Sequence, residues 1–340
     1  MTEVSKDLDQ RAYDLHRKAI VINPLDSTGI SALTPGYLTK LARGGVTAFC
    51  SSDDVREFLT AVMRISKSYG VLETNGSKLM HIRSAEDIRE AKLKNLTGMI
   101  LGLQDTPIDG NLAFLKILHR LGVRVIQVTY QRRNLLGDGC GERTDAGLSK
   151  FGVQAVEEMN KLGLLIDLSH VGMATTLDTI RMSKDPVAFT HTCVRSLCNH
   201  VRNKSDEEIK AMAEKGGVMG IAYLSHMIRP DGNIKGTSVE DYLDHVDYVA
   251  KMVGVDHVGI GLDYKDDRKK ESWDRLPNVY PELAVKGPYD FSNATVKELR
   301  DIGNLTEITK GLLTRGYSDQ DIEKILGKNF LNLFERVWRN

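Results

Sequence analysis

Two histidines stand at the ends of two apolar runs, and their types and placement suggest metal chemistry. The run Leu164-Leu165-Ile166 leads into Asp167-Leu168-Ser169-His170, and a second run ends in Thr190-His191. In an eight-stranded parallel βα barrel, side chains at the carboxyl ends of neighbouring strands converge on one mouth, where catalytic groups collect. Neutral imidazole is the commonest side-chain ligand of divalent transition ions. The pair predicts a metal site, whereas either histidine alone could simply cap a strand and bond to backbone.

Other strand ends add polar groups to the same expected mouth. The first strand is expected to end at Asp26, the third at Gln104 and the fourth at Tyr130. The eighth ends at Asp263, a carboxylate suited to orienting a metal-bound water or moving a proton, although an aspartate that caps the next helix would look the same. These groups require strands that deliver them to one edge.

Arg202 and Asn203 follow His191 in a loop that should lie over the mouth. Arg202 offers a planar fork for a substrate carboxylate, and Asn203 beside it is expected to contact the substrate. Cys193 and Cys198, with His200, match no compact zinc motif and are expected to be ordinary thiols.

Eight short apolar or β-branched runs alternate with amphipathic helical stretches, which predicts an α/β protein built from parallel βαβ units. The runs are 19–22, 46–50, 99–103, 123–128, 164–167, 187–191, 218–223 and 258–262, and clear helical stretches are 111–121, 152–161, 205–215 and 239–253. Residues 264–292 read as a long loop, and 296–338 return to helical spacing. We therefore expect a single (β/α)8 TIM-type barrel over residues 1–340, with C-terminal helices.

The composition excludes several classes. Among 340 residues, 41% are hydrophobic and 27% charged, and 46 basic side chains balance 46 acidic ones, which gives no support for binding nucleic acid or a membrane. The four cysteines form no CxxC pair and the first residues lack an apolar signal core, so we expect a cytoplasmic protein.

Taken in order, several segments resemble the membrane (renal) dipeptidase family of zinc peptidases, a branch of the amidohydrolase-like metal-dependent barrels. They are 121–124, 147–148, 167–171, 190–191, 202–203, 216–218, 254–261 and 326–330. The resemblance implies two zinc ions, held by a His-x-Asp pair, a bridging glutamate and two further histidines. His170 and His191 match the latter two, Asp263 matches an acidic residue of the family, and Arg202 matches its carboxylate-binding arginine. A homodimer is also implied.

Three positions depart from the family pattern. Pro24 replaces the histidine before Asp26, Gln104 replaces the bridging glutamate, and Tyr130 replaces a histidine expected to contact the substrate. Without the bridging negative charge, two dications would repel each other strongly. We therefore expect one divalent ion, with zinc the default, on His170 and His191, assisted by the Gln104 carbonyl, Asp26 or water.

These residues leave three functions open. The first is hydrolysis of an amide bond in a dipeptide or another small substrate bearing a carboxylate, with Asp263 as the base. The second uses Tyr130 and Asp263 as acid and base for elimination, deamination or ring opening. The third is a non-catalytic binding protein, which predicts neither a metal requirement nor turnover.

Overall fold

A computed structural model of the chain describes residues 3–283 and 290–339. Within them, nine strands form one parallel sheet in the order β1-β2-β4-β5-β6-β7-β8-β9, with β3 beside β4. The strands are β1 Ile22–Asp26, β2 Ala48–Asp53, β3 Leu79–Ile82, β4 Thr97–Leu103, β5 Val123–Gln127, β6 Leu165–Asp167, β7 Ala188–Thr192, β8 Val218–Ile221 and β9 Val258–Ile260. The expected (β/α)8 TIM-type barrel is confirmed.

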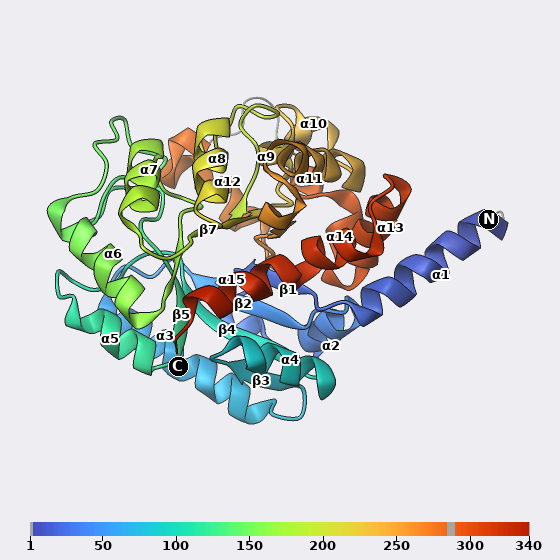
Figure 1. The fold of residues 1–340 in the computed structure, drawn as a ribbon, viewed down its shortest axis with the longest axis horizontal. Helices are drawn as coiled ribbons and strands as arrows, with labels where there is room; N and C mark the ends of the chain where they lie inside the picture. Colours follow the sequence, from blue (N-terminus) through green and yellow to red (C-terminus); the bar gives the residue numbers. More distant parts are fainter. Residues whose placement is uncertain (1–2, 284–289, 340) are drawn as a thin grey trace.

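Helices surround these strands, as Figure 1 shows. They are α1 Glu3–Lys18, α2 Pro35–Arg43, α3 Phe58–Thr74, α4 Ala85–Leu93, α5 Ala113–Arg120, α6 Lys150–Leu162, α7 Met173–Met182, α8 Asp206–Glu214, α9 Ser225–Ile228, α10 Gly232–Lys235, α11 Val239–Val253, α12 Lys270–Val279, α13 Thr306–Thr314, α14 Asp319–Glu323 and α15 Asn329–Val337. No helix in the described ranges is both long and apolar enough to cross a bilayer.

Local signals explain where helices begin and end. The Ser205 hydroxyl accepts from the Glu208 amide while the Glu208 carboxylate accepts from the Ser205 amide, a capping box that starts α8. Helix α6 stops at Gly163, whose left-handed backbone (φ 69°) satisfies the last carbonyls. Such signals lie in the sequence, which is why these helices were predicted closely.

Two strands differ from the sequence prediction. Strand β1 begins at Ile22, where the expected run 19–22 ends. It contains Pro24, which lies at a register irregularity between Asn23 and Asp26, where a missing N–H donor is tolerated. Strand β3 was not predicted. It pairs with the first half of β4, up to Ile100, and β5 pairs with the second half from Leu101, so eight strands remain at the mouth.

The segment expected to be one long loop, 264–292, is partly helical. Helix α12 occupies Lys270–Val279, and residues 284–289 of that prediction lie outside the described part of the chain. The loop between β9 and α12 lies over the mouth, since Lys265 and Arg268 line the cavity there together with His170.

The ring of strands is nearly closed by a seam between β1 and the segment after β9. Asp26 and Tyr264 form an isolated parallel bridge, and the Ser27 amide donates to the Tyr264 carbonyl at 2.7 Å. Residues at the two ends of the sheet are thereby joined directly beside Asp263. The seam is part of the mouth.

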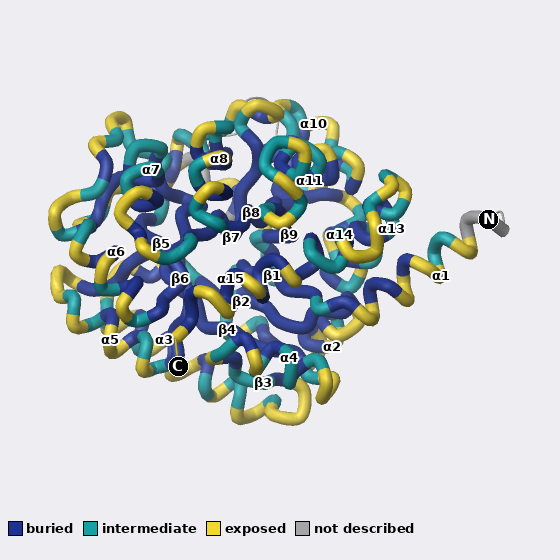
Figure 2. Tube along the Cα trace, viewed as in Figure 1, coloured by how far each residue is buried: buried dark blue, intermediate teal, exposed yellow. Residues whose placement is uncertain are grey.

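The opposite end of the barrel is filled by α15. Inward-facing residues at the starts of several strands, among them Ile22, Ala48 and Val218, form one buried cluster with Phe330 and Phe334 of α15. The strands are buried almost throughout while the outer helix faces carry the exposed residues (Figure 2). Since α15 covers the amino-terminal end, the carboxyl-terminal mouth is left for function.

Candidate active site

A cavity of about 350 Å³ opens at the carboxyl ends of the strands, and polar side chains from many of them line it. Those contributed by the segments after β4 to β9 are Gln104, Tyr130, His170, Arg202, His226 and Asp263. The strand ends therefore bring His170, Arg202, Tyr130, Gln104 and Asp263 of the sequence prediction into one cavity. His191, Asn203 and Asp26 do not line it.

His191 lies directly behind His170, and their Nε2 atoms are 2.8 Å apart. The Thr190 hydroxyl sets the tautomer of His191. Fully buried Asp167 accepts four hydrogen bonds, one of them from Thr190 Oγ1 at 2.7 Å, so the same Oγ1 can only accept from His191 Nδ1, also at 2.7 Å. The proton of His191 therefore sits on Nδ1, and its Nε2 presents a lone pair to His170.

His170 completes the pair at some cost. Burial, and then the positive charge of Arg202, hold the pKa of both imidazoles well below the ordinary value, so both rings are neutral. If His170 donates from Nε2 to His191, its Nδ1 is left as a lone pair, and this buried atom has no partner. An unpartnered buried polar atom costs about 1–3 kcal/mol, which marks the pair as built for a function rather than for stability.

Tyr130 stacks on His170, with ring centroids 4.2 Å apart. Burial, and then the negative charges of Asp54 and Asp263, raise the pKa of Tyr130 well above its ordinary value. The hydroxyl therefore keeps its proton and can act as a donor, not as a base at neutral pH.

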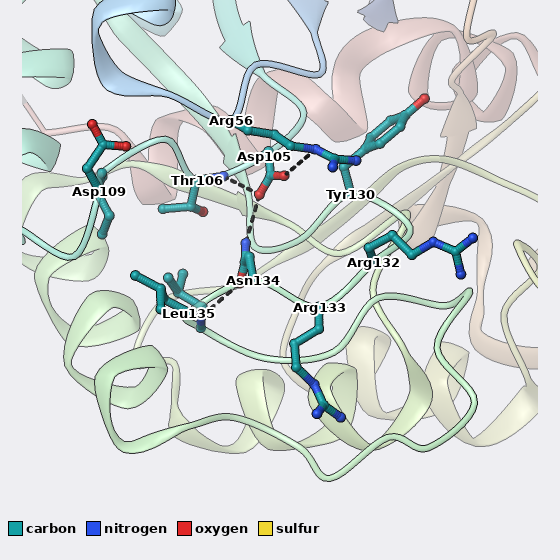
Figure 3. Close-up of a pocket in the computed structure, with 11 residues that line it drawn as sticks. Arg56, Asp105, Thr106, Asp109, Tyr130, Arg132, Arg133, Asn134 and Leu135 are labelled. Carbon is teal, nitrogen blue, oxygen red and sulfur yellow. Dashed lines mark hydrogen bonds and ion pairs between the residues drawn. The ribbon is translucent and has the colours of Figure 1, made fainter. Parts of the chain in front are cut away.

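Tyr130 also borders a second, smaller cavity of about 180 Å³ (Figure 3). Asp105 lies at its centre, where it accepts from Asn134 Nδ2 at 2.7 Å and from the Thr106 amide at 2.8 Å, with Arg56 Nε at 3.8 Å. Burial raises the pKa of Asp105 to about 6. Its oxygens are occupied by these loop contacts, so Asp105 belongs to the wall that supports Tyr130.

Asp263 reaches the main cavity on an unusual backbone. Its φ is 56°, in the left-handed region that non-glycine residues rarely adopt, and Gln131, another lining residue, has a φ of 59°. Such conformations cluster at functional sites. Burial raises the pKa of Asp263, and the nearby Arg268 and Arg202 oppose that rise. A carboxylate with a raised pKa is better matched to proton transfer near neutral pH than an ordinary one.

Arg202 is fastened to the histidine strands. Its Nη1 donates to the Ser169 carbonyl and its Nη2 to the His191 carbonyl at 3.3 Å, while the side chain borders the cavity. Asn203 points elsewhere: its Nδ2 donates to the Cys198 and Met227 carbonyls, both at 2.7 Å, and the side chain is fully buried. Asn203 holds the loop together at a distance from the cavity.

The two side chains expected to assist the histidines, Asp26 and Gln104, have other hydrogen-bond partners in the structure. Asp26 accepts from Tyr37 Oη at 2.5 Å and from the Thr28 amide at 3.0 Å, and burial raises its pKa to about 6. Gln104 faces the cavity but donates from Nε2 to the Ser52 carbonyl at 3.3 Å. Within residues 3–283 and 290–339, no group of three or more His, Cys, Asp and Glu side chains is arranged to hold a metal ion. The two imidazoles are the donors that fit one.

Sequence reasoning did not single out His226, Arg268, Asp53 or Asp54, which also line the cavity. Asp53 is the last residue of β2 and pairs with Arg64 at 2.6 Å. The signal for it was available, because an acidic pair directly after a buried strand run is the same pattern as Asp263. His226 lies in the four-residue helix α9 and Arg268 in a loop, and segments this short give no period from which to place a side chain.

Comparison with known proteins identifies relatives of this chain. The family model of membrane dipeptidases, peptidase family M19, matches residues 44–287 and 280–340. Dipeptidase verJ of Clonostachys rogersoniana is 28% identical over 285 residues, which are 83% of this chain and 66% of that protein. The chain spans about half to two thirds of the length of the curated relatives it matches.

Two solved structures share the fold. An amidohydrolase from Pseudomonas aeruginosa is 31% identical, with a TM-score of 0.88 over 96% of this chain and 99% of that one. A metallopeptidase from Rhodobacter sphaeroides, liganded with a phosphinate mimic of the dipeptide L-Ala-D-Ala, is 19% identical, with a TM-score of 0.77 over 94% of this chain and 100% of that one. The family model and the 31% identical structure cover nearly the whole barrel. The chain belongs to the membrane dipeptidase family.

Proposed function

We propose that this chain is a metal-dependent, dipeptidase-like hydrolase that cleaves an amide bond in a small substrate bearing a carboxylate. The observation that carries the proposal is the pair of neutral imidazoles, with Nε2 atoms 2.8 Å apart, at a cavity that also holds Asp263 and Arg202. Membership of the membrane dipeptidase family supports the same reaction class.

We further propose one divalent ion rather than two, and zinc as that ion. His170 and His191 would hold it through their Nε2 atoms. These two atoms face each other at 2.8 Å, a contact that requires a proton on one of them. Gln104 or water would supply the remaining positions, because Tyr37 occupies Asp26. When bound, the ion supplies Lewis-acid polarisation of the scissile carbonyl.

The side chains around the pair have distinct tasks in this proposal. Arg202 binds the substrate carboxylate. Its hydrogen bonds to the Ser169 and His191 carbonyls hold it at a fixed position relative to the two histidines. Asp263 accepts a proton from the attacking water and returns it to the leaving nitrogen. Tyr130 donates its hydroxyl proton in a hydrogen bond to the oxygen on which negative charge develops.

We also propose that the protein works in a reducing cytoplasm and as a homodimer. The four cysteines are free, which suits that compartment. The dimer is inferred from family resemblance, and sedimentation analysis of the purified chain tests it.

The test of function uses the purified protein loaded with zinc and a panel of dipeptides and N-acyl amino acids in water enriched in ¹⁸O. Hydrolysis is expected to give two products, with one label incorporated into the newly formed carboxylate. Metal removal by a chelator should abolish turnover, and re-addition of zinc should restore it.

The same panel separates hydrolysis from the alternative reactions. Elimination, or loss of ammonia without water addition, would give products of different mass and no label in a new carboxylate. A His170→Ala variant that keeps both its metal and its turnover would overturn the proposed mechanism. A zinc-loaded protein that transforms no member of the panel would favour a binding role.

A further inference from the structure

A second arginine, Arg268, faces the same cavity as Arg202. It lies in the loop between β9 and α12 and lines the cavity with Arg202 and Asp263. Its Nη2 donates to the Asp263 carbonyl at 3.3 Å, and its guanidinium carbon lies 5.0 Å from the centre of the Trp273 ring. These contacts fix the plane of the guanidinium at the cavity wall.

Neither guanidinium is neutralised by an ion pair with a carboxylate of the described residues. Arg202 donates to two backbone carbonyls, and Arg268 donates to one and also to the side chain of Tyr223. The Nε of Arg268 is buried and has no hydrogen-bond partner. A guanidinium without a carboxylate partner can bind an anionic group of a ligand through its remaining N–H donors.

Arg202, Arg268 and Lys265 line the cavity together with three carboxylates, Asp53, Asp54 and Asp263, and Asp53 is already paired with Arg64 at 2.6 Å. Burial raises the pKa of Asp263, and this carboxylate lies close enough to both arginines for their charges to oppose that rise. Lys265, also in the cavity wall, is already engaged with the Ser27 carbonyl at 3.2 Å and with Asp267 at 3.9 Å. Burial, and then His200, Arg268 and Arg202, hold the pKa of His226 well below its ordinary value, so this neighbour adds no charge.

We propose that Arg268 is a second carboxylate-binding residue, and that the substrate's carboxyl-terminal residue is acidic, an aspartate or a glutamate. Arg202 takes the terminal carboxylate and Arg268 the side-chain carboxylate. Arg202 and Arg268 line the same cavity of about 350 Å³, together with Asp263 and His226. The inference rests on the proposed function for the reaction, but its recognition step can be measured separately.

A purely structural role for Arg268 makes a different prediction. If Arg268 only supported the Asp263 backbone and the Trp273 ring, its loss would weaken acidic and neutral substrates by the same factor. If it binds the second carboxylate, its loss would remove the preference for acidic ligands. The ratio between two nearly isosteric ligands therefore separates the roles.

The experiment measures binding of N-acetylglutamate and N-acetylglutamine, in both stereoisomers, to the zinc-loaded protein by calorimetry. Turnover of Ala-Glu and Ala-Gln is measured in parallel. A charge-assisted pair of hydrogen bonds predicts that the wild-type chain prefers the acidic ligand by about 10- to 100-fold. Arg268→Gln should bring this ratio close to one, and Arg268→Lys should keep part of it. Lys269→Gln makes the same charge change one residue away, outside the cavity, and should leave the ratio unchanged.

Each result has a definite reading. Equal binding of the two ligands by the wild-type protein, or an unchanged ratio in Arg268→Gln, overturns the proposal. A binding preference that depends on Arg268 in a protein that cleaves neither dipeptide keeps this inference and refutes the proposed hydrolysis of these substrates. Cleavage of both dipeptides at equal rates, with no binding preference, does the reverse.

Discussion

The two halves of the site that family resemblance predicts have different fates in this molecule. On the side of β6 and β7, His191 is held by the Thr190 hydroxyl and meets His170 at 2.8 Å. On the side of β1 and β4, Asp26 is capped by Tyr37 at 2.5 Å and Gln104 carries no charge. In the first half the two imidazoles contact each other and His170 lines the cavity, whereas in the second half Asp26 is bound to structural partners and Gln104 lines the cavity as a neutral side chain.

The difference teaches that a metal centre can lose ligands without losing the scaffold that presents them. Asp26 remains at the seam of the barrel, where its oxygens bind Thr28 and Tyr37 and serve structure. The imidazole half still has the features of a ligand pair: neutral rings, a tautomer set by a neighbouring hydroxyl, and an arginine beside it. Four experiments can break or sharpen this comparison.

The largest effect is expected from removing one imidazole. His191→Ala should lower kcat/KM by more than about 100-fold, above the range typical for groups that only orient a ligand, and should abolish zinc binding. Zinc content and steady-state kinetics measured on the same preparation check both. Retention of zinc in this variant would show that the ion binds elsewhere.

The next effect concerns the hydroxyl that sets the tautomer. Thr190→Val removes the acceptor for His191 Nδ1–H, and we expect a loss of about 10- to 100-fold in zinc affinity. Thr190→Ser keeps the hydroxyl and should retain most of the affinity. Equal losses in the two variants would mean that the methyl group, and not the hydrogen bond, matters.

A third experiment attempts to restore the missing half. Pro24→His with Gln104→Glu and Tyr37→Phe supplies the family's ligands and frees Asp26, so the zinc content should rise from about one to about two ions per chain. Elemental analysis after gel filtration measures it. Gln104→Glu alone is the matched control and should stay at one, since Asp26 is still capped. A triple variant that also stays at one would place the barrier in the backbone of β1.

The smallest effect on turnover is expected at Asp26. Asp26→Asn should change kcat/KM by no more than about twofold, because Asp26 lies outside the cavity, but it should alter stability. Burial raises the pKa of Asp26 from 3.8 to about 6, so the folded state holds the proton more tightly than the unfolded state. The wild-type chain should therefore lose about 3 kcal/mol relative to Asp26→Asn as pH rises from about 3 to about 7, with most of the loss between about pH 4 and 6.

Denaturant unfolding of both proteins across that pH range measures the difference. An equal pH dependence in wild type and variant would contradict the assigned protonation of Asp26. If added zinc removes the difference, Asp26 is a metal ligand after all, and the contrast between the two halves fails.

Much of the fold could be predicted because its signals are local. Apolar runs and capping residues such as Ser205 mark strands and helix starts, and parallel strands must deliver His170, Tyr130 and Asp263 to one mouth. Strand β3 and helix α12 were missed because neither carries a strong period. The sealing of Asp26 could not be predicted, since its partner Tyr37 comes from a helix whose packing against β1 leaves no mark in the sequence.

The positions that loops determine were the least accessible. Asn203 and Arg202 are adjacent in sequence, yet one is buried against backbone and the other borders the cavity. Arg268 reaches that cavity from a loop that the sequence describes only as polar. In loops, no strand or helix periodicity determines where a side chain points, so the sequence gives its chemical type but not its orientation.

The seam between β1 and the segment after β9 has a further consequence for how activity is acquired. Ser27 and Tyr264 are far apart in the sequence, yet the Ser27 amide donates to the Tyr264 carbonyl. The Ser27 hydroxyl also lies 3.4 Å from Asp263 Oδ1. Contacts between such distant residues form late in folding, because a long loop must close first. A barrel with every other strand in place would still lack a correctly held Asp263, so during refolding the first turnover should coincide with completion of the ring.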